Sequence, residues 1–284
     1  MNDTQTDASR KNKILPDRFT LPDIFCIIQT VPKQKIKGDG NMKKILALVL
    51  ALMLTLCAFA ALAEGVMTHE DYAAAELETE VTVETYVQAK QGWWENNGVG
   101  NATIYTQAED GAYFLYNLPM SQEDYEKLVP GTKIRVTGYK AEWAGEVEII
   151  DATYEILEAE AFIPEALDVT ALLGTDDLIA HQNELVCVKG ATVVAKKDAN
   201  GNDAAFLYNW DGSGAAGNNN DLYFDVEVNG AVYSFTVESY LCGEGTEVYD
   251  AVTKLNIGDK IDVEGFLYWY NGAQPHVTAV KAAE

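Results

Sequence analysis

Two eight-residue stretches decide the fold of this chain: Gly131-Thr-Lys-Ile-Arg-Val-Thr-Gly138 and Gly258-Asp-Lys-Ile-Asp-Val-Glu-Gly265. Apolar and polar residues alternate within each stretch, which is the pattern of a strand with one buried face. Two further matching stretches precede them, Tyr113-Phe-Leu-Tyr-Asn117 and Ala205-Phe-Leu-Tyr-Asn209. Because the order and the residues both agree, the sequence indicates an internal duplication.

Each copy predicts strands interrupted by one short helix. Residues 81–83 and 103–106 alternate in polarity, and residues 134–136 resume that alternation after a polar break. The break opens with Ser121-Gln-Glu-Asp124, which predicts a capped helix start, and residues 246–255 predict the matching helix of the second copy. Three strands, a helix and two strands joined by a tight glycine turn are the order of an OB barrel. We therefore predict an all-β chain with short helices, built from two tandem five-stranded OB-fold barrels.

The second copy has 35 more residues than the first between the two matching blocks. They comprise a polar loop at 211–220, a strand at 222–228, an Asn229-Gly230 turn and a strand at 231–241. Asn-Gly between alternating segments is typical of a two-residue hairpin. We interpret the extra residues as an enlarged hairpin added to the barrel wall.

The segment before the first copy predicts export. Met42-Lys-Lys44 precedes an apolar run at 45–60 and a small-x-small site, Ala61-Leu-Ala63, before Glu64. These are the three parts of a Sec signal peptide, so we expect a secreted or extracytoplasmic protein beginning next to Glu64, with no stable membrane insertion after cleavage. A retained N-terminal anchor stays open as the alternative, although the run is slightly short for a spanning helix.

The predicted organisation has six parts. They are an upstream over-extension of the reading frame, expected to be disordered, at 1–41; a signal peptide at 42–63; a leader helix at 64–79; a first OB-fold domain at 80–160; a linker and leader helix at 161–183; and a second OB-fold domain with an enlarged hairpin at 184–284.

The charge of the mature chain restricts its partners. From Glu64 onward, 11 basic and 39 acidic residues give a formal charge of −28. A field of that sign repels other polyanions, which argues against DNA, RNA or anionic membranes as strong general partners.

The mature chain resembles tandem secreted OB-fold domains of the nucleic-acid-binding, tRNA-anticodon-binding type. The resemblance is carried by Leu185-Val-Cys-Val-Lys-Gly190 after its leader helix, by Phe206-Leu-Tyr-Asn209 and by the block at 258–265. The first copy matches less well, because it lacks the glycine of the first strand. The resemblance implies a binding module whose ligand is a single-stranded oligonucleotide.

The sequence contains no recognisable catalytic or cofactor site. His69, His181 and His276 are not at metal-ligand spacing from one another or from a cysteine, and no nucleophile elbow or phosphate loop is present. Arg135 is the only arginine after the signal peptide, which excludes a thermonuclease-type site. Residues 198–203 begin like a calcium loop but lack its later ligands, so a polar turn explains them. We predict a non-enzyme with no metal and no cofactor.

Aromatic residues supply the candidate binding face. If Leu115 and Leu207 point into their barrels, alternation places the neighbouring rings outside, where OB barrels stack flat ligands. The candidates are Phe114, Tyr116, Tyr139, Trp143, Phe206, Tyr208, Trp210, Phe266, Tyr268 and Tyr270. We expect Phe206, Tyr208 and Trp210 to contribute most. The alternative is that these rings pack beneath the leader helices, the long hairpin or the other domain.

The ligand stays open between an oligonucleotide, a glycan and a protein. Lysines that converge beside the rings would favour nucleic acid, and scattered lysines would favour a cell-surface glycan or protein. The lysines in question are Lys90, Lys133, Lys140, Lys189, Lys196 and Lys197. Cys187 and Cys242 are expected in one domain, either as a disulfide of an exported protein or as small apolar fillers.

Overall fold

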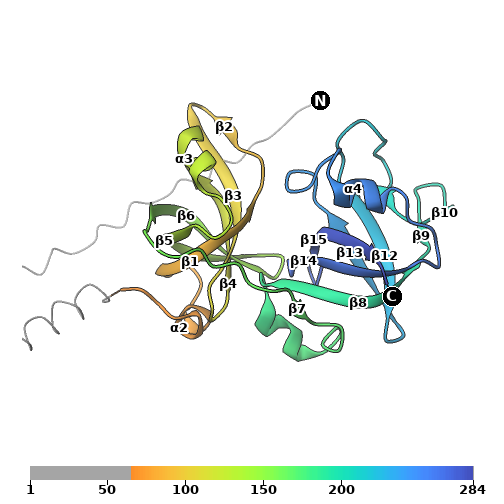
Figure 1. Ribbon diagram of the computed structural model, residues 1–284, viewed down its shortest axis with the longest axis horizontal. Coiled ribbons are helices and arrows are strands. Elements are labelled where there is room, and N and C mark those ends of the chain that lie inside the picture. Colours follow the sequence, from red (N-terminus) through yellow and green to blue (C-terminus); the bar gives the residue numbers. More distant parts are fainter. Residues whose placement is uncertain (1–64, 284) are drawn as a thin grey trace, which may run out of the picture. The chain divides into compact units, whose positions relative to one another are not determined.

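The computed structural model describes residues 65–283 (Figure 1). The over-extension and the signal peptide predicted before Glu64 lie outside these residues. Strands dominate the described part, and its helices span six residues each. The prediction of a mostly β chain with short helices is therefore confirmed.

Residues 80–156 close into a five-stranded barrel. Its strands are β1 (Glu80–Lys90), β3 (Val99–Gln107), β4 (Ala112–Pro119), β5 (Lys133–Trp143) and β6 (Glu146–Ile156). The ring of pairings runs β1-β5-β6-β4-β3 and returns to β1, with β4 and β6 parallel. Helix α3 (Gln122–Lys127) lies between β4 and β5, the third and fourth of these strands along the chain. This is the predicted order of an OB barrel.

Alternating burial explains why these segments form strands of a barrel. In β1, Val81, Val83, Thr85 and Val87 are buried while the alternate residues 82, 84 and 86 are partly exposed. These valines join a core that also contains the fully buried Leu115. Ser121 begins α3 as predicted, because its hydroxyl accepts a hydrogen bond from the Asp124 amide at 3.1 Å.

Residues 167–282 form a second sheet. Its strands are β7 (Leu167–Asp168), β8 (Leu185–Val194), β11 (Leu207–Tyr208), β12 (Leu222–Val228), β13 (Ala231–Val237), β14 (Lys260–Phe266) and β15 (His276–Ala282). Strands β8, β12, β13, β15 and β14 pair in the order seen in the first barrel. Helix α4 (Glu247–Val252) directly precedes β14, which is the fourth of these strands along the chain. The parallel contact of β13 with β15 is a single residue pair, Thr236 with His276.

The structure corrects the predicted alignment of the two copies. The blocks 131–138 and 258–265 do occupy matching places, since β5 lies between β1 and β6 and β14 lies between β8 and β15. The stretch 205–209 does not match 113–117, because β11 pairs only at the edge with β12. Strands β12 and β13, with seven residues each, supply the wall that two-residue β11 is too short to form. The residues interpreted as an enlarged hairpin are therefore two of the main strands of the second sheet.

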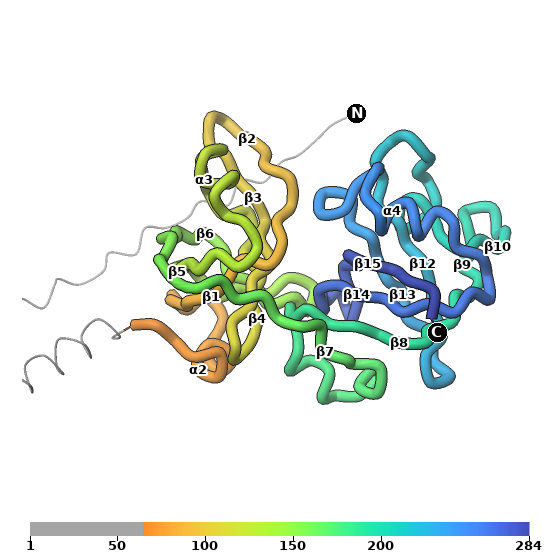
Figure 2. Tube along the Cα trace, in the orientation of Figure 1, coloured from red at the N-terminus to blue at the C-terminus, as the bar shows by residue number. Residues whose placement is uncertain are grey.

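The smaller elements connect these sheets. They are α2 (His69–Ala74), β2 (Trp94–Asn96), the 3-10 helix η2 (Asp176–His181), β9 (Lys196–Lys197) and β10 (Asp203–Ala204). Residues 157–166 run from β6 to β7 without helix or strand (Figure 2). The first leader helix is found as α2, capped by Thr68. The second was expected within 161–183 and is the 3-10 helix η2. Asn229 and Gly230 both adopt positive φ, as their predicted hairpin turn requires.

Candidate ligand-binding groove

Two adjoining hollows lie where the first barrel contacts the second sheet. Their volumes are about 730 Å³ and about 640 Å³, and Trp143, Glu238, Tyr268 and His276 line both. We call the combined hollow the aromatic groove. A space of this size suits a small ligand or a few units of a chain molecule.

Exposed aromatic rings gather at the aromatic groove. Among residues 65–283, seven Trp or Tyr side chains are exposed, and all except Tyr139 line the groove. The six are Trp94, Tyr116, Trp143, Trp210, Tyr240 and Tyr270. Trp210 and Tyr240 are each 73% exposed. Such a concentration of solvated apolar rings is unfavourable unless a partner covers it.

Buried rings support the groove from below. Tyr105, Phe114 and Phe266 form a separate core cluster, with the Tyr105 and Phe266 rings stacked at 4.6 Å between centroids. The Tyr105 hydroxyl and His276 Nδ1 lie 2.6 Å apart in a buried hydrogen bond. Tyr268 stacks on His276 with 4.1 Å between ring centroids. Burial lowers the pKa of His276 to about 3, so its ring is neutral.

Two carboxylates face the groove. Glu238 accepts hydrogen bonds from Gln91 Nε2 at 3.0 Å and from the Tyr240 amide at 3.1 Å, both neutral donors. Glu148 lines the same hollow and is only 9% exposed. Burial raises the pKa of each carboxyl to about 7, in Glu238 against the opposing effect of its backbone hydrogen bonds. The groove therefore offers hydrogen-bond acceptors that become anionic near neutral pH.

Polar contacts hold the walls of the groove together. Glu146 is fully buried and accepts hydrogen bonds from the Trp269 amide at 2.8 Å and from Gln182 Nε2 at 3.3 Å. Gln107 Oε1 accepts one from the Leu185 amide at 2.8 Å. Each of these contacts joins the first barrel to the chain that follows it, so the aromatic rings are placed on a fixed support.

The ten rings predicted from sequence divide into two groups. Six line the groove: Phe114, Tyr116, Trp143, Trp210, Tyr268 and Tyr270. Phe206 and Tyr208 instead pack against the core of the second sheet, and Phe266 is buried beneath the groove. Tyr139 is exposed but lies elsewhere. Of the three rings expected to contribute most, Trp210 lines the groove, whereas Phe206 and Tyr208 lie on and beside the short edge strand β11 and do not line it.

Sequence reasoning missed several residues of the groove. Trp94, Tyr240, Glu148, Glu238 and His276 all line it. Trp94 follows Trp93 in a polar segment, and that pair was a usable signal for an exposed aromatic site. The remaining four come from β6, from the turn that follows β13 and from β15. Only the contact between the two sheets brings them together.

The six lysines do not converge on the rings. Lys90 and Lys140 donate to backbone oxygens, of Tyr125 and of the end of α2 respectively. Lys189 pairs with Asp168, and Lys197 pairs with Asp203. Among the six, Lys196 alone lines the groove, and its Nζ lies 2.8 Å from Asp225 Oδ1.

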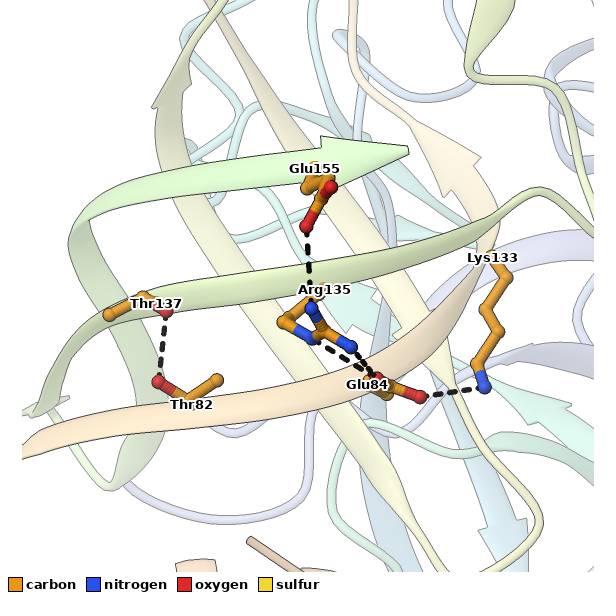
Figure 3. A network of polar contacts seen from close by, with 6 residues as sticks. All are labelled: Thr82, Glu84, Lys133, Arg135, Thr137 and Glu155. Atoms are coloured by element: carbon orange, nitrogen blue, oxygen red, sulfur yellow. Dashed lines mark hydrogen bonds and ion pairs between the residues drawn. The ribbon is translucent and has the colours of Figure 1, made fainter. Parts of the chain in front are cut away.

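Lys133 and Arg135 are held in a network on the wall of the first barrel (Figure 3). Glu84 on β1 accepts from Arg135 Nη2 at 2.6 Å and pairs with Lys133 Nζ at 2.7 Å, both on β5. Arg135 also reaches Glu155 on β6 at 3.4 Å. These cross-strand pairs neutralise two of the 11 Lys and Arg residues that follow Glu64.

Cys187 and Cys242 are free thiols in the structure. Cys187 Sγ lies 3.9 Å from the Ala166 carbonyl oxygen, and Cys242 packs against the core of the second sheet. Burial raises the pKa of Cys242 to about 11, which makes its thiol unreactive. The filler interpretation describes Cys242 as it stands, whereas Cys187 belongs to none of the core clusters.

The turn at 198–203 is closed by its own side chains. Asp198 accepts from the amides of Asn200 and Asn202, each at 2.8 Å. Within residues 65–283 no group of three or more His, Cys, Asp or Glu side chains is arranged to hold a metal ion. The same residues include no helix with the length and apolarity needed to cross a membrane.

No family model and no curated protein sequence matches the chain. Several solved structures share 10–15% sequence identity with it. A murine DNA-binding protein bound to double-stranded DNA is 14% identical over 71% of this chain and 99% of its own, with a TM-score of 0.34. A deletion mutant of the single-stranded DNA-binding protein from Thermus aquaticus is 13% identical over 72% and 94%, with a TM-score of 0.26. At these scores neither likeness decides the function, and the fold rests on the strand order described above.

Proposed function

We propose that this chain is an exported, non-catalytic binding protein that holds a glycan in the aromatic groove. The gathering of six exposed rings at one hollow carries the proposal. Pyranose rings present flat C–H faces that stack on Trp and Tyr, and OB barrels bind oligosaccharides as well as oligonucleotides. Acceptors and amides such as Glu238 and Gln91 would bind sugar hydroxyls beside those rings.

The proposal includes a second OB barrel. The ring order β8-β12-β13-β15-β14 repeats that of the first barrel, and α4 stands at the matching place. The groove would then be formed by the outer faces of two related barrels. Export is proposed from the Sec-type segment at 42–63 alone.

Electrostatics favours a glycan over an oligonucleotide. Tight binding of a phosphate backbone draws on several Lys or Arg contacts that release counterions. Here Lys196 is the one lysine in the part of the groove formed by residues 65–283, and Asp225 already pairs with it. The OB-type barrel and its stacking rings favour single-stranded nucleic acid as the second candidate, which the experiment below separates.

His276 lines the groove but is not suited to act as a general base. Its pKa of about 3 leaves it too weak a base for proton transfer near neutral pH, and Tyr105 occupies its Nδ1. The residues that line the groove are suited to stacking and hydrogen bonding.

Truncation of a groove ring should weaken glycan binding strongly. We expect Trp143→Ala to reduce the affinity for a glycan about tenfold to a hundredfold, because one stacked ring contributes about 1–3 kcal/mol. The measurement is calorimetric titration of the full chain with cellohexaose, the N-acetylglucosamine hexamer and a twelve-residue oligo-dT.

Tyr139→Ala is the matched control, since Tyr139 is also exposed but lies outside the groove. It should leave the affinity unchanged. Binding of oligo-dT in place of both hexamers, with a steep loss of affinity in salt, would establish the second candidate and reject the first. Equal affinities for Trp143→Ala and Tyr139→Ala would show that the ligand binds elsewhere.

A further inference from the structure

The charged groups that face the aromatic groove are predominantly acidic. Glu148 comes from β6, Glu238 follows β13 and Asp221 precedes β12. The basic groups lining it within residues 65–283 are Lys196 on β9, paired with Asp225, and His276 on β15, which is neutral. A ligand that fills the groove therefore meets uncompensated negative charge.

Glu148 is the most informative of these groups. Its side chain is nine-tenths buried and lines the groove, yet no hydrogen bond or ion pair within residues 65–283 satisfies its carboxylate. Its carboxylate oxygens are not fully enclosed, so a donor that enters the groove can reach them without displacing a partner within residues 65–283. Thr236 Oγ1, which lines the second of the two hollows, is buried without a partner.

Aromatic rings flank the two glutamates. Tyr116, Trp143 and Tyr268 line the same hollow as Glu148 and Glu238. The faces of Trp and Tyr rings attract a cation through their quadrupole, and carboxylates attract it directly. Rings and carboxylates around one space form a site for an ammonium group attached to a flat, partly apolar body.

We propose that the aromatic groove selects glycans built from amino sugars with free, protonated amines, and that Glu148 and Glu238 receive the ammonium groups. This inference rests on the glycan-binding function proposed above. It adds the chemical class of the sugar and assigns the two anionic contacts.

The test compares two ligands with the same sugar rings, one with free amines and one with acetylated amines. The glucosamine hexamer carries free amines, and the N-acetylglucosamine hexamer has the same rings with neutral amides. In calorimetric titrations of the full chain at pH 7, we expect the glucosamine hexamer to bind about tenfold more tightly. Glu148→Gln and Glu238→Gln should each reduce that ratio toward one, because each variant weakens binding of the glucosamine hexamer more than binding of the neutral hexamer.

The preference should also depend on pH. Because the pKa of each glutamate is raised to about 7, both are mostly protonated at pH 5 and more ionised at pH 7. At equal protonation of the ligand, which is set by separate titration of the free hexamer's amines, the affinity for the glucosamine hexamer should therefore fall as the pH is lowered from 7 to 5. The affinity for the neutral hexamer should change little over that range.

Glu227→Gln removes the same charge from an exposed position of β12 that does not line the groove. This control should keep the full preference. If it reduces the ratio as much as Glu238→Gln does, the preference reflects the general acidity of the chain and the inference is overturned. Equal affinity for the two hexamers, with Trp143→Ala still weakening both, overturns the inference but keeps the glycan function. Binding of neither hexamer rejects both.

Discussion

Replacement of Gly265 by alanine should lower the free energy of unfolding by about 3 kcal/mol, at the upper end of overpacking effects. A Cβ at this position would lie 2.3 Å from the His276 carbonyl oxygen and 2.8 Å from Val277 Cα. Both atoms are backbone of β15, so they cannot turn aside as the end of a side chain could. The register of β14 with β15 shifts at this residue, and the bulge requires close approach of the two strands.

Denaturant unfolding of the full chain measures this effect, with Gly92→Ala as the control. The nearest atom to a Cβ at Gly92 is 4.0 Å away, so its stability should change by no more than about 0.5 kcal/mol. Gly138→Ala should resemble Gly265→Ala, because its Cβ would lie 2.7 Å from Ala152 Cβ and 2.8 Å from the Ile150 oxygen. Equal stability of Gly265→Ala and Gly92→Ala would contradict the close approach.

Truncation of Tyr105 should have an effect of similar size. Tyr105 is fully buried, contacts Phe114 and Phe266, and hydrogen-bonds to His276. We expect Tyr105→Ala to lower the free energy of unfolding by about 3–5 kcal/mol, as for other buried aromatic residues. It would also remove the support of the groove, so glycan affinity should fall in the protein that remains folded.

Tyr105→Phe separates the contribution of the ring to stability from that of the hydroxyl. It keeps the stack on Phe266 and leaves His276 Nδ1 without its partner, at a cost of about 1–3 kcal/mol. Denaturant unfolding of both variants gives the two contributions. A loss below about 1 kcal/mol for Tyr105→Ala would mean that the ring does not contribute to the stability of this junction.

The strands and the first barrel could be predicted because their information is local. Alternation in β1 and β5 reports burial residue by residue, and Ser121 marks the start of α3 directly. The glycines at 138 and 265 were recognised as a repeat, and the structure supplies their reason: each faces a neighbouring strand too closely for a Cβ. By contrast, the short match at 205–209 carried no information on strand pairing, and the alignment built on it was wrong.

The groove could be predicted only in part. The alternation of side chains along β4 correctly placed Leu115 inside the barrel and Phe114 on the opposite face. Whether an outward ring is solvated or covered depends on what packs against that face, which no local pattern reports. Phe114 is therefore buried against Tyr268, while Tyr116, two residues later, is exposed.

The indole N–H signals of the five tryptophans test the central claim most directly. Trp94, Trp143 and Trp210 line the aromatic groove, whereas Trp93 donates to the Met120 oxygen and Trp269 packs against the second core. In a two-dimensional ¹H–¹⁵N NMR titration with the glucosamine hexamer, the signals of the first three should shift together, that of Trp143 most because it lines both hollows. The signals of Trp93 and Trp269 should stay in place. No shift at Trp143, or shifts confined to Trp93 and Trp269, would contradict binding in the groove.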